Sequence, residues 1–281
     1  AMDAFAGAIG VSDSDGKSTP VYSVCQPEAG ADAHFYAFLL REMARSQWIV
    51  ALARGIRERS TDFRFDGFAS QWVPLPPLPE QQAIVRYLDY HDRLIRRYLR
   101  AKRRLIALLE EQKQGIINQA VTRGLDPSVR VKHSGVEWLE EIPETWSIYR
   151  IRNAVNVIVS NVDKHIKDNE YPVRLCNYVD VYKNNRITNK VKFMTATALM
   201  EEIQQFRLQK NDVLITKDSE MWNDIGVPAL VDYSADDLIC GYHLAILRPK
   251  NNMIIGGYLF WLLQSNGISS QFYISANGVT R

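Results

Sequence analysis

Apolar residues recur every three or four positions from residue 80 to residue 123, which is the longest periodic pattern in the chain. No proline interrupts this stretch, its only glycine is Gly115, and most of its residues are good helix formers. Four prolines between Pro74 and Pro79 precede it, and Pro79 suits the first position of a helix. The pattern therefore predicts a single helix of about 44 residues, or about 65 Å at 1.5 Å per residue.

A wide apolar face predicts that this helix has a partner along its length. One stripe alternates steps of four and three, and seven of its ten positions are apolar or aromatic. A second apolar stripe overlaps it, which suits helix pairing or a small bundle better than a narrow dimer seam. The residues expected to face the partner are Ile84, Leu88, Ile95, Tyr98, Leu105, Leu109 and Ile116. We expect either the same helix of a second copy, in antiparallel orientation, or a different protein subunit to pair with this face.

The same helix is locally basic. Between Arg86 and Lys132 there are 12 Lys and Arg residues against 5 Asp and Glu residues, a net charge of +7, while the whole chain carries +2. A solvated helix face explains such a run, and so does contact with an acidic partner or a DNA backbone. Both interpretations stay open at this point.

Shorter patterns on either side predict mixed helices and strands. Residues 7–26 predict two short strands around a polar turn, and residues 33–53 predict a helix that bends or continues into a second one. Gly124 and Pro127 predict the end of the long helix. Beyond them we expect a linker at 128–134 and a turn-rich entry to a second globular region at 135–146. The elements expected after the entry are a strand and then a short helix at 148–159, strands at 173–181, 212–216, 225–231 and 238–247, and helices at 195–205 and 258–265.

Composition describes an ordinary globular protein. Of the 281 residues, 46% are hydrophobic and 23% are charged, and no apolar run approaches the roughly 18 residues that a membrane span needs. We therefore expect a soluble, cytoplasmic protein with an α+β fold. The three cysteines, Cys25, Cys176 and Cys240, are far apart and match neither a metal site nor a disulfide framework. We expect them to be reduced and mostly buried.

The two ends of the chain repeat each other weakly. Ile-Gly-Val occurs at residues 9–11 and again at 225–227, and each copy is followed by an apolar strand pattern and then by an aromatic-rich helix pattern. This similarity predicts a divergent duplication in which the first copy shows only its second half. We therefore expect the chain to be a piece of a longer protein with the order domain, helix, domain, helix.

Several segments of the sequence resemble those of one protein family. Residues 74–82, Pro-Leu-Pro-Pro-Leu-Pro-Glu-Gln-Gln, resemble the opening of the central helical region in the specificity subunits of Type I restriction–modification systems. Residues 113–125 resemble the end of that region, and the Gly-Val-Glu-Trp-Leu stretch that opens residues 135–146 resembles the start of a target-recognition domain. Residues 210–216, Lys-Asn-Asp-Val-Leu-Ile-Thr, resemble a strand of that domain.

The resemblance implies a non-catalytic DNA-binding protein without a cofactor. It implies two mixed α/β target-recognition domains that each read half of a split double-stranded DNA site, joined by a long helix that forms an antiparallel coiled coil. It also implies that the helices dock a methyltransferase subunit and, through it, a restriction subunit. The corresponding division of the chain is 1–74 for the end of the first recognition domain, 75–125 for the spacer helix, 126–134 for a linker and 135–281 for the second recognition domain.

Polar and basic residues in the second recognition domain are the candidate DNA contacts. Lys and Arg bind guanine or phosphate, and Asn pairs with adenine. The candidates are Asn161, Lys164, Lys167, Lys183, Asn184, Arg186, Lys190, Lys217, Trp222 and Asn223. The alternative for each is a solvated loop residue.

Catalytic motifs are absent from the sequence. There is no Gly-x-Gly-x-x-Gly loop, no Asn/Asp-Pro-Pro-Tyr/Phe motif and no metal-ligand spacing. The stretch Gly16-Lys17-Ser18 lacks the upstream glycine that a phosphate-binding loop needs. A nuclease that uses Asp212, Lys217 and Glu220 with a divalent metal is one alternative to the recognition subunit. A helical dimerisation scaffold without DNA specificity is another.

Overall fold

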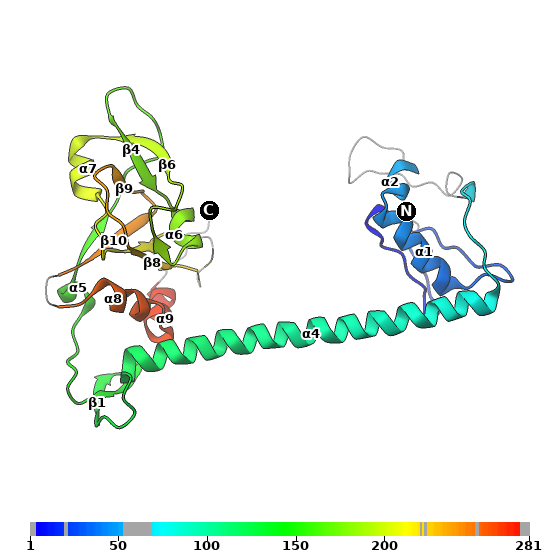
Figure 1. Cartoon of the computed structure of the whole chain (residues 1–281), viewed down its shortest axis with the longest axis horizontal. Helices are drawn as coiled ribbons and strands as arrows, with labels where there is room; N and C mark the ends of the chain where they lie inside the picture. The colour runs from blue at the N-terminus through cyan, green and yellow to red at the C-terminus, as the bar shows by residue number, and fades with distance from the viewer. Residues whose placement is uncertain are drawn as a thin grey trace. The chain divides into compact units, whose positions relative to one another are not determined.

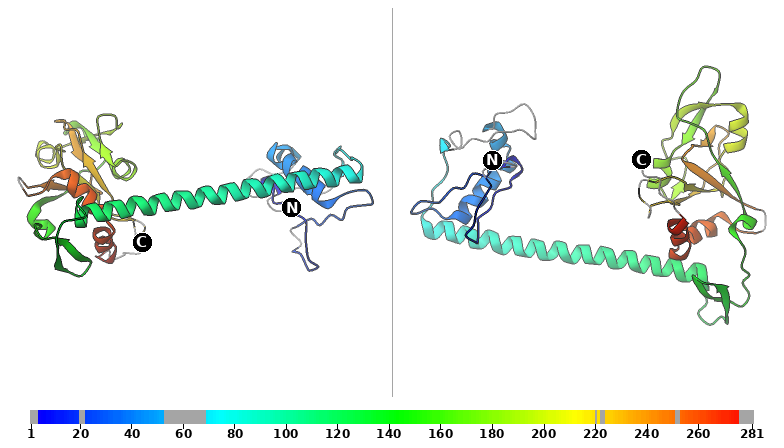
Figure 2. Two further views of the ribbon diagram at one scale, coloured as in Figure 1. Left: turned by 60° about the horizontal axis from the view of Figure 1, so that its bottom comes forward. Right: turned by 180° about the vertical axis from the view of Figure 1, so that it is seen from behind.

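The protein forms two compact units, Ala1–Leu105 and Ile106–Arg281, and helix α4 (Leu78–Arg123) contributes to both. The structure is a computed structural model that describes residues 4–19, 22–52, 69–219, 221, 224–250 and 253–275. In every view α4 is one unbroken helix (Figures 1 and 2). The sequence prediction of a long helix is therefore confirmed, with a start two residues earlier than expected.

Unit 1 is built from short helices that pack near the start of α4. These are a 3-10 helix at Ala4–Ala6, α1 at Ala33–Arg45 and α2 at Trp48–Leu52. Asp32 caps α1 because its carboxylate accepts a hydrogen bond of 2.9 Å from the Phe35 amide. Ala4, Ala44 and Ile49 form the buried core of this unit within the described residues.

A buried glutamine connects the first turn of α4 to α1. Gln81 is 0% exposed. Its side-chain oxygen accepts from the Asp32 amide at 2.8 Å, and its Nε2 donates to the carbonyls of Gly30 at 2.8 Å and Pro76 at 2.7 Å. The Pro77 carbonyl accepts from the amide of Gln81 itself, so the proline turn and the helix start form one hydrogen-bonded unit. Pro79 lies in the first turn, where it leaves no amide unpaired.

The described residues of unit 2 form three sheets. The first is a hairpin of β1 (Val131–Val136) and β2 (Leu139–Pro143). The second has the order β3-β10-β7-β8-β5, with β3 Val155–Val159, β10 Leu244–Pro249, β7 Val213–Thr216, β8 Pro228–Val231 and β5 Arg186–Ile187. The third has the order β6-β4-β9, with β6 Met194–Ala198, β4 Tyr171–Cys176 and β9 Leu238–Cys240. The helices are α5 Ile151–Ala154, α6 Tyr178–Lys183, α7 Met200–Phe206, α8 Gly256–Leu263 and α9 Asn266–Ser275.

Alternate side chains of the five-stranded sheet enter two different cores. Leu214 and Ile246 join the core that also holds the three-stranded sheet. Val213 and Leu247 join a second core with residues of α8, among them Phe260. Both faces of β7 are therefore covered, which explains why its four residues are all buried and why the sequence shows a continuous apolar run there.

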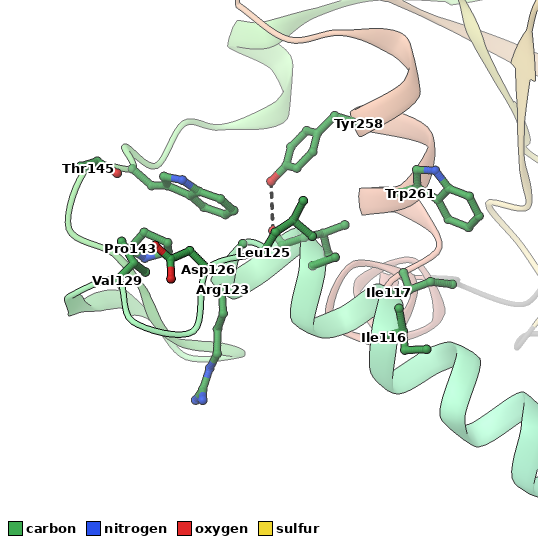
Figure 3. A pocket seen from close by; sticks show the side chains of 14 residues that line it. Ile116, Ile117, Arg123, Leu125, Asp126, Val129, Pro143, Thr145, Tyr258 and Trp261 are labelled. Carbon is green, nitrogen blue, oxygen red and sulfur yellow. Dashed lines mark hydrogen bonds between the residues drawn. The ribbon is translucent and has the colours of Figure 1, made fainter.

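The last turns of α4 are fixed to α8 and α9 (Figure 1). Gln114 Nε2 donates to the Gln264 carbonyl at 3.0 Å, and Asn118 Oδ1 accepts from the Asn266 amide at 3.0 Å. The Tyr258 hydroxyl donates to the Val121 carbonyl at 3.0 Å. Figure 3 shows this bond beside an apolar hollow of about 720 Å³.

Several predicted elements are wrong. Residues 7–19 and 22–26 contain no strand, because two short strands gain little stability when no third strand pairs with them, and most of these residues are exposed. The order at 148–159 is reversed, with α5 before β3. The predicted helix at 195–205 begins as strand β6, and the predicted strand at 173–181 ends in α6.

Other corrections concern a linker, a divided strand, an additional helix and one cysteine. The predicted linker at 128–134 includes the start of β1, and the stretch 238–247 forms two strands separated by a turn. Helix α9 had no expected counterpart. Cys176 and Cys240 are buried as expected, but Cys25 is exposed. The sequence also predicts a charged, glycine-containing loop at 55–70, and most of that stretch lies outside the described residues.

Candidate nucleic-acid interface

The ends of several strands meet at one edge of the five-stranded sheet. Strand β10 runs antiparallel to both β3 and β7, so the start of β10 lies beside the ends of β3 and β7. The connection from β7 to β8 lies on the same edge because these strands are also antiparallel neighbours. We call the described residues of the segments 160–165, 217–227 and 241–243 the loop edge.

Hydrogen bonds join the three segments of the loop edge to one another. Lys217 Nζ donates to the Ser160 carbonyl at 3.4 Å, and the Lys217 amide donates to the His243 carbonyl at 3.0 Å. The Tyr242 amide donates to the Val162 carbonyl at 2.9 Å. Each segment is thus fixed by backbone contacts to another, so the side chains that project from them are held on a common support.

Helix α6 is attached to the same edge by a tyrosine. The Tyr182 hydroxyl forms a hydrogen bond with the Asp224 carboxylate, and this bond and the nearby negative charge raise the pKa of Tyr182. Lys183 is the last residue of α6, and Asn184 ends the helix by donating its Nδ2 to the Asp180 carbonyl at 2.8 Å. The end of α6 therefore lies with the 217–227 segment.

An aspartate and a histidine pair across the loop edge. His243 Nδ1 lies 2.8 Å from an oxygen of Asp218, and the side chains are 42% and 56% exposed. The His243 ring also lies against the Tyr242 ring, with centroids 3.7 Å apart. Sequence reasoning did not find the pair because its members are 25 residues apart. The sequence feature that could have indicated this pair is that polar residues directly follow β7 and directly precede β10.

Half of the ten predicted contact residues lie at this edge. Asn161 and Lys164 are exposed on the 160–165 segment, and Lys217 is half-buried beside it. Lys183 is exposed and Asn184 is half-buried at the end of α6. Within the described part of the chain, Lys164 and Lys183 form no ion pair, so both carry a positive charge that no other described residue compensates.

The other predicted contact residues are bound elsewhere or not described. Arg186 pairs with Asp232 at 2.6 Å. Lys167 pairs with Glu170 at 3.3 Å and with Asp163 at 3.4 Å, and these partners, Glu170 first, raise the pKa of Lys167. Two charges that were predicted to meet DNA are thus already compensated. Lys190 lies in the turn between β5 and β6, and Trp222 and Asn223 lie outside the described residues.

The nuclease alternative is wrong. Asp212 is 1% exposed, and its two oxygens accept from Arg248 Nε and Nη2, each at 2.8 Å. It precedes β7, whereas Lys217 follows β7, so the two side chains lie at opposite ends of the strand. Glu220 lies outside the described residues, and among the residues that are described no group of three His, Cys, Asp or Glu could hold a metal ion. Asp212 is therefore a structural ion-pair residue.

Comparison with known proteins shows what this chain is similar to. No protein-family model matches it. Over 196 residues, 69% of its length, it is 25% identical to the Type I restriction enzyme MjaVIII specificity subunit of Methanocaldococcus jannaschii. The chain resembles a Type I specificity subunit. The match spans 44% of that relative, so the chain corresponds to about half of its length.

One solved structure is also similar to this chain. The crystal structure of the HsdS subunit from Thermoanaerobacter tengcongensis matches 88% of this chain and 55% of its own, with 19% identity and a TM-score of 0.44. The resemblance inferred from the residues is confirmed by the sequence match. The mixture of helices and sheets with one long helix is also as predicted. In the described ranges, no helix is both long and apolar enough to cross a membrane.

Proposed function

We propose that this chain is the DNA-sequence recognition subunit, or part of it, of a Type I restriction–modification system. In this proposal unit 2 binds one half of a split double-stranded DNA site through the loop edge and the end of α6. The observation that carries it is that hydrogen bonds hold the loop edge and the end of α6 together, so that Asn161, Lys164 and Lys183 lie at the same edge of the sheet. The similarity to a specificity subunit supports the same function.

The chemistry of the loop edge suits DNA. Exposed Lys164 and Lys183 provide positive charges for phosphate oxygens, and the Asn161 amide can both donate to and accept from a base edge. The Asp218 carboxylate beside Nδ1 of His243 favours the tautomer with a proton on Nδ1. In this tautomer Nε2 carries a lone pair that can accept from the amino group of adenine or cytosine. The loop edge thus combines groups that position DNA with groups that read bases.

We further propose that α4 is the spacer and docking element. Of its seven predicted partner-facing residues, Ile95, Tyr98, Leu105, Leu109 and Ile116 are each between 46% and 62% exposed. Such a row of exposed apolar side chains on a long helix favours a protein partner. The partners that the proposed function requires are a methyltransferase subunit, a restriction subunit bound through it, and a second copy of this chain in an antiparallel coiled coil.

Removing two lysines from the loop edge is expected to weaken DNA binding. With Lys164→Ala and Lys183→Ala together, the slope of log affinity against log salt should fall by about 1.8, because each phosphate contact contributes about 0.9. The measurement is fluorescence anisotropy of a labelled duplex that carries the cognate site, over a range of salt.

The matched control removes two cations from the opposite edge of the same sheet. Arg152 precedes β3 and Lys210 precedes β7, and both are exposed. The variant with Arg152→Ala and Lys210→Ala has the same net charge as the test variant and should bind DNA like the wild type. Equal losses in the two variants would reject the loop edge as the binding surface.

The second candidate function is a helical dimerisation scaffold without DNA specificity, which the exposed apolar row on α4 favours. Light scattering of the purified chain, alone and with the cognate methyltransferase subunit, tests the docking role of this row. We expect a dimer that also captures the methyltransferase subunit. A dimer that captures neither this subunit nor DNA supports the scaffold, and a monomer that ignores both contradicts the docking role of α4.

A further inference from the structure

The arginines of α4 are concentrated on one side of the helix. Between Asp92 and Glu110 the sequence has seven basic residues and no acidic one. Successive residues of an α-helix are about 100° apart, so six arginines of this stretch fall within an arc of about 120°. We call these six the arginine face: Arg93, Arg96, Arg97, Arg100, Arg103 and Arg104.

The apolar residues of the same turns lie on the opposite side. Relative to Arg93, the positions of Ile95, Leu99 and Leu105 fall between about 120° and 240° around the helix axis. The centre of the arginine face is therefore roughly opposite the centre of the apolar face. A protein that covers the apolar face leaves the arginine face in solvent, so the two faces can bind different partners at the same time.

The charges of the arginine face are almost uncompensated. All six side chains are exposed. Arg96 pairs with Asp92 at 2.5 Å, and the other five arginines form no ion pair with any described residue. Pairs such as Arg93 with Arg97 are one turn apart, where like charges repel and destabilise the helix. A ligand with several negative charges removes this repulsion, which a solvated face does not.

We infer that the arginine face binds the phosphate backbone of double-stranded DNA without reading its sequence. From Arg93 to Arg104 the helix rises about 16 Å, which is similar to the axial rise over five steps between successive phosphates, at about 3.4 Å per step on one strand. The guanidinium group is a planar fork that binds phosphate through two parallel hydrogen bonds. This inference rests on the proposed function and adds to the loop edge a second contact that is independent of base sequence.

The test replaces four arginines of this face with glutamine. Glutamine forms helices nearly as well as arginine, so Arg93→Gln, Arg97→Gln, Arg100→Gln and Arg104→Gln should leave α4 folded, which circular dichroism checks. The probe is a labelled duplex of mixed sequence without a cognate site. We expect the slope of log affinity against log salt to fall by about 3 to 4, and the affinity at low salt to fall at least tenfold, because four phosphate contacts of about 0.9 each are lost.

Two further variants separate charge from position. Replacing the same four arginines with lysine keeps the charges, so it should retain most of the salt dependence. Replacing four exposed cations elsewhere with glutamine, namely Arg45, Arg130, Arg152 and Lys210, changes the net charge equally and should leave the slope near that of the wild type. A loss as large in this control as in the test variant would overturn the inference.

The remaining outcomes distinguish this inference from the proposed function. If the arginine variant binds like the wild type while the Lys164 and Lys183 variant loses cognate binding, the inference is overturned and the proposed function stands. If the wild type binds neither duplex, both are overturned. If polyglutamate binds the wild type as tightly as the duplex does, and the arginine variant loses both equally, the face selects acidic polymers in general and the assignment to DNA is overturned.

Discussion

Replacing Asp212 with alanine is expected to destabilise unit 2 by about 3–5 kcal/mol, the usual cost of removing one partner of a buried ion pair. Asp212 is 1% exposed, and the side chain of Arg248 is 21% exposed. Both carboxylate oxygens accept from this guanidinium at 2.8 Å, and one also accepts from the Gln209 amide at 2.8 Å. Without the carboxylate, the positive charge of Arg248 stays largely buried and keeps only its bond to the Arg207 carbonyl.

Hydrogen exchange is the measurement because it reports each unit separately. The amides of β7 and β10 should lose protection in the Asp212→Ala variant by the same free energy, while amides of α1 in unit 1 should keep theirs. Asp236→Ala is the matched control. Asp236 also pairs with an arginine, Arg207, but its side chain is 99% exposed, so its removal should cost about 1 kcal/mol at most. Equal effects of the two substitutions would show that burial of the Asp212 pair does not govern stability.

Replacing Gln81 with alanine is expected to loosen unit 1 by about 2–4 kcal/mol. The substitution leaves the Asp32 amide and the carbonyls of Gly30 and Pro76 without their partner, and a buried polar group without a partner costs about 1–3 kcal/mol. The total is smaller than the sum because water reaches part of the opened site. Asp32 caps α1, so the loss should extend into that helix.

The neighbouring residue provides the control. Gln82 is exposed, so Gln82→Ala should change stability by no more than about 0.5 kcal/mol. Gln81→Glu keeps the oxygen that accepts from Asp32 but removes both donors, so it should be as harmful as alanine or more so. The measurement is hydrogen-exchange protection of the Asp32 amide and of α1. Unchanged protection in Gln81→Ala would mean that packing, and not this amide, holds α1 on the start of α4.

The comparison of Gln81 with its neighbours shows what can be predicted from the sequence alone. By local pattern alone, the Glu-Gln-Gln sequence after the prolines is a favourable group at the positive end of the helix dipole. In the structure Gln81 instead bonds to groups that lie up to 51 residues away along the chain. Nothing in the local pattern distinguishes it from Gln82, because the distinction depends on which of the two points towards α1.

Errors in the strand predictions have the same origin. Alternating residues at 7–26 satisfy the local pattern of a strand, but in the described part of the stretch no third strand pairs with them, and no strand forms there. In unit 2 the same kind of pattern at 213–216 does form a strand, because β8 and β10 pair with it and apolar residues cover both faces. The neighbouring strands and the apolar residues that bury β7 come from distant parts of the chain.

By itself, the sequence determined the long helix with its two ends, the apolar row and the excess of arginine on it, and the resemblance to a specificity subunit. These depend on signals a few residues apart, such as Gly124, whose φ of +79° ends α4 as predicted. Only the tertiary structure decided that Asn161, Lys183 and Lys217 lie at one edge and that Arg186 and Asp212 are bound in ion pairs. Strand pairing and burial bring together residues that are tens of positions apart, and a local pattern does not record which distant residues will meet.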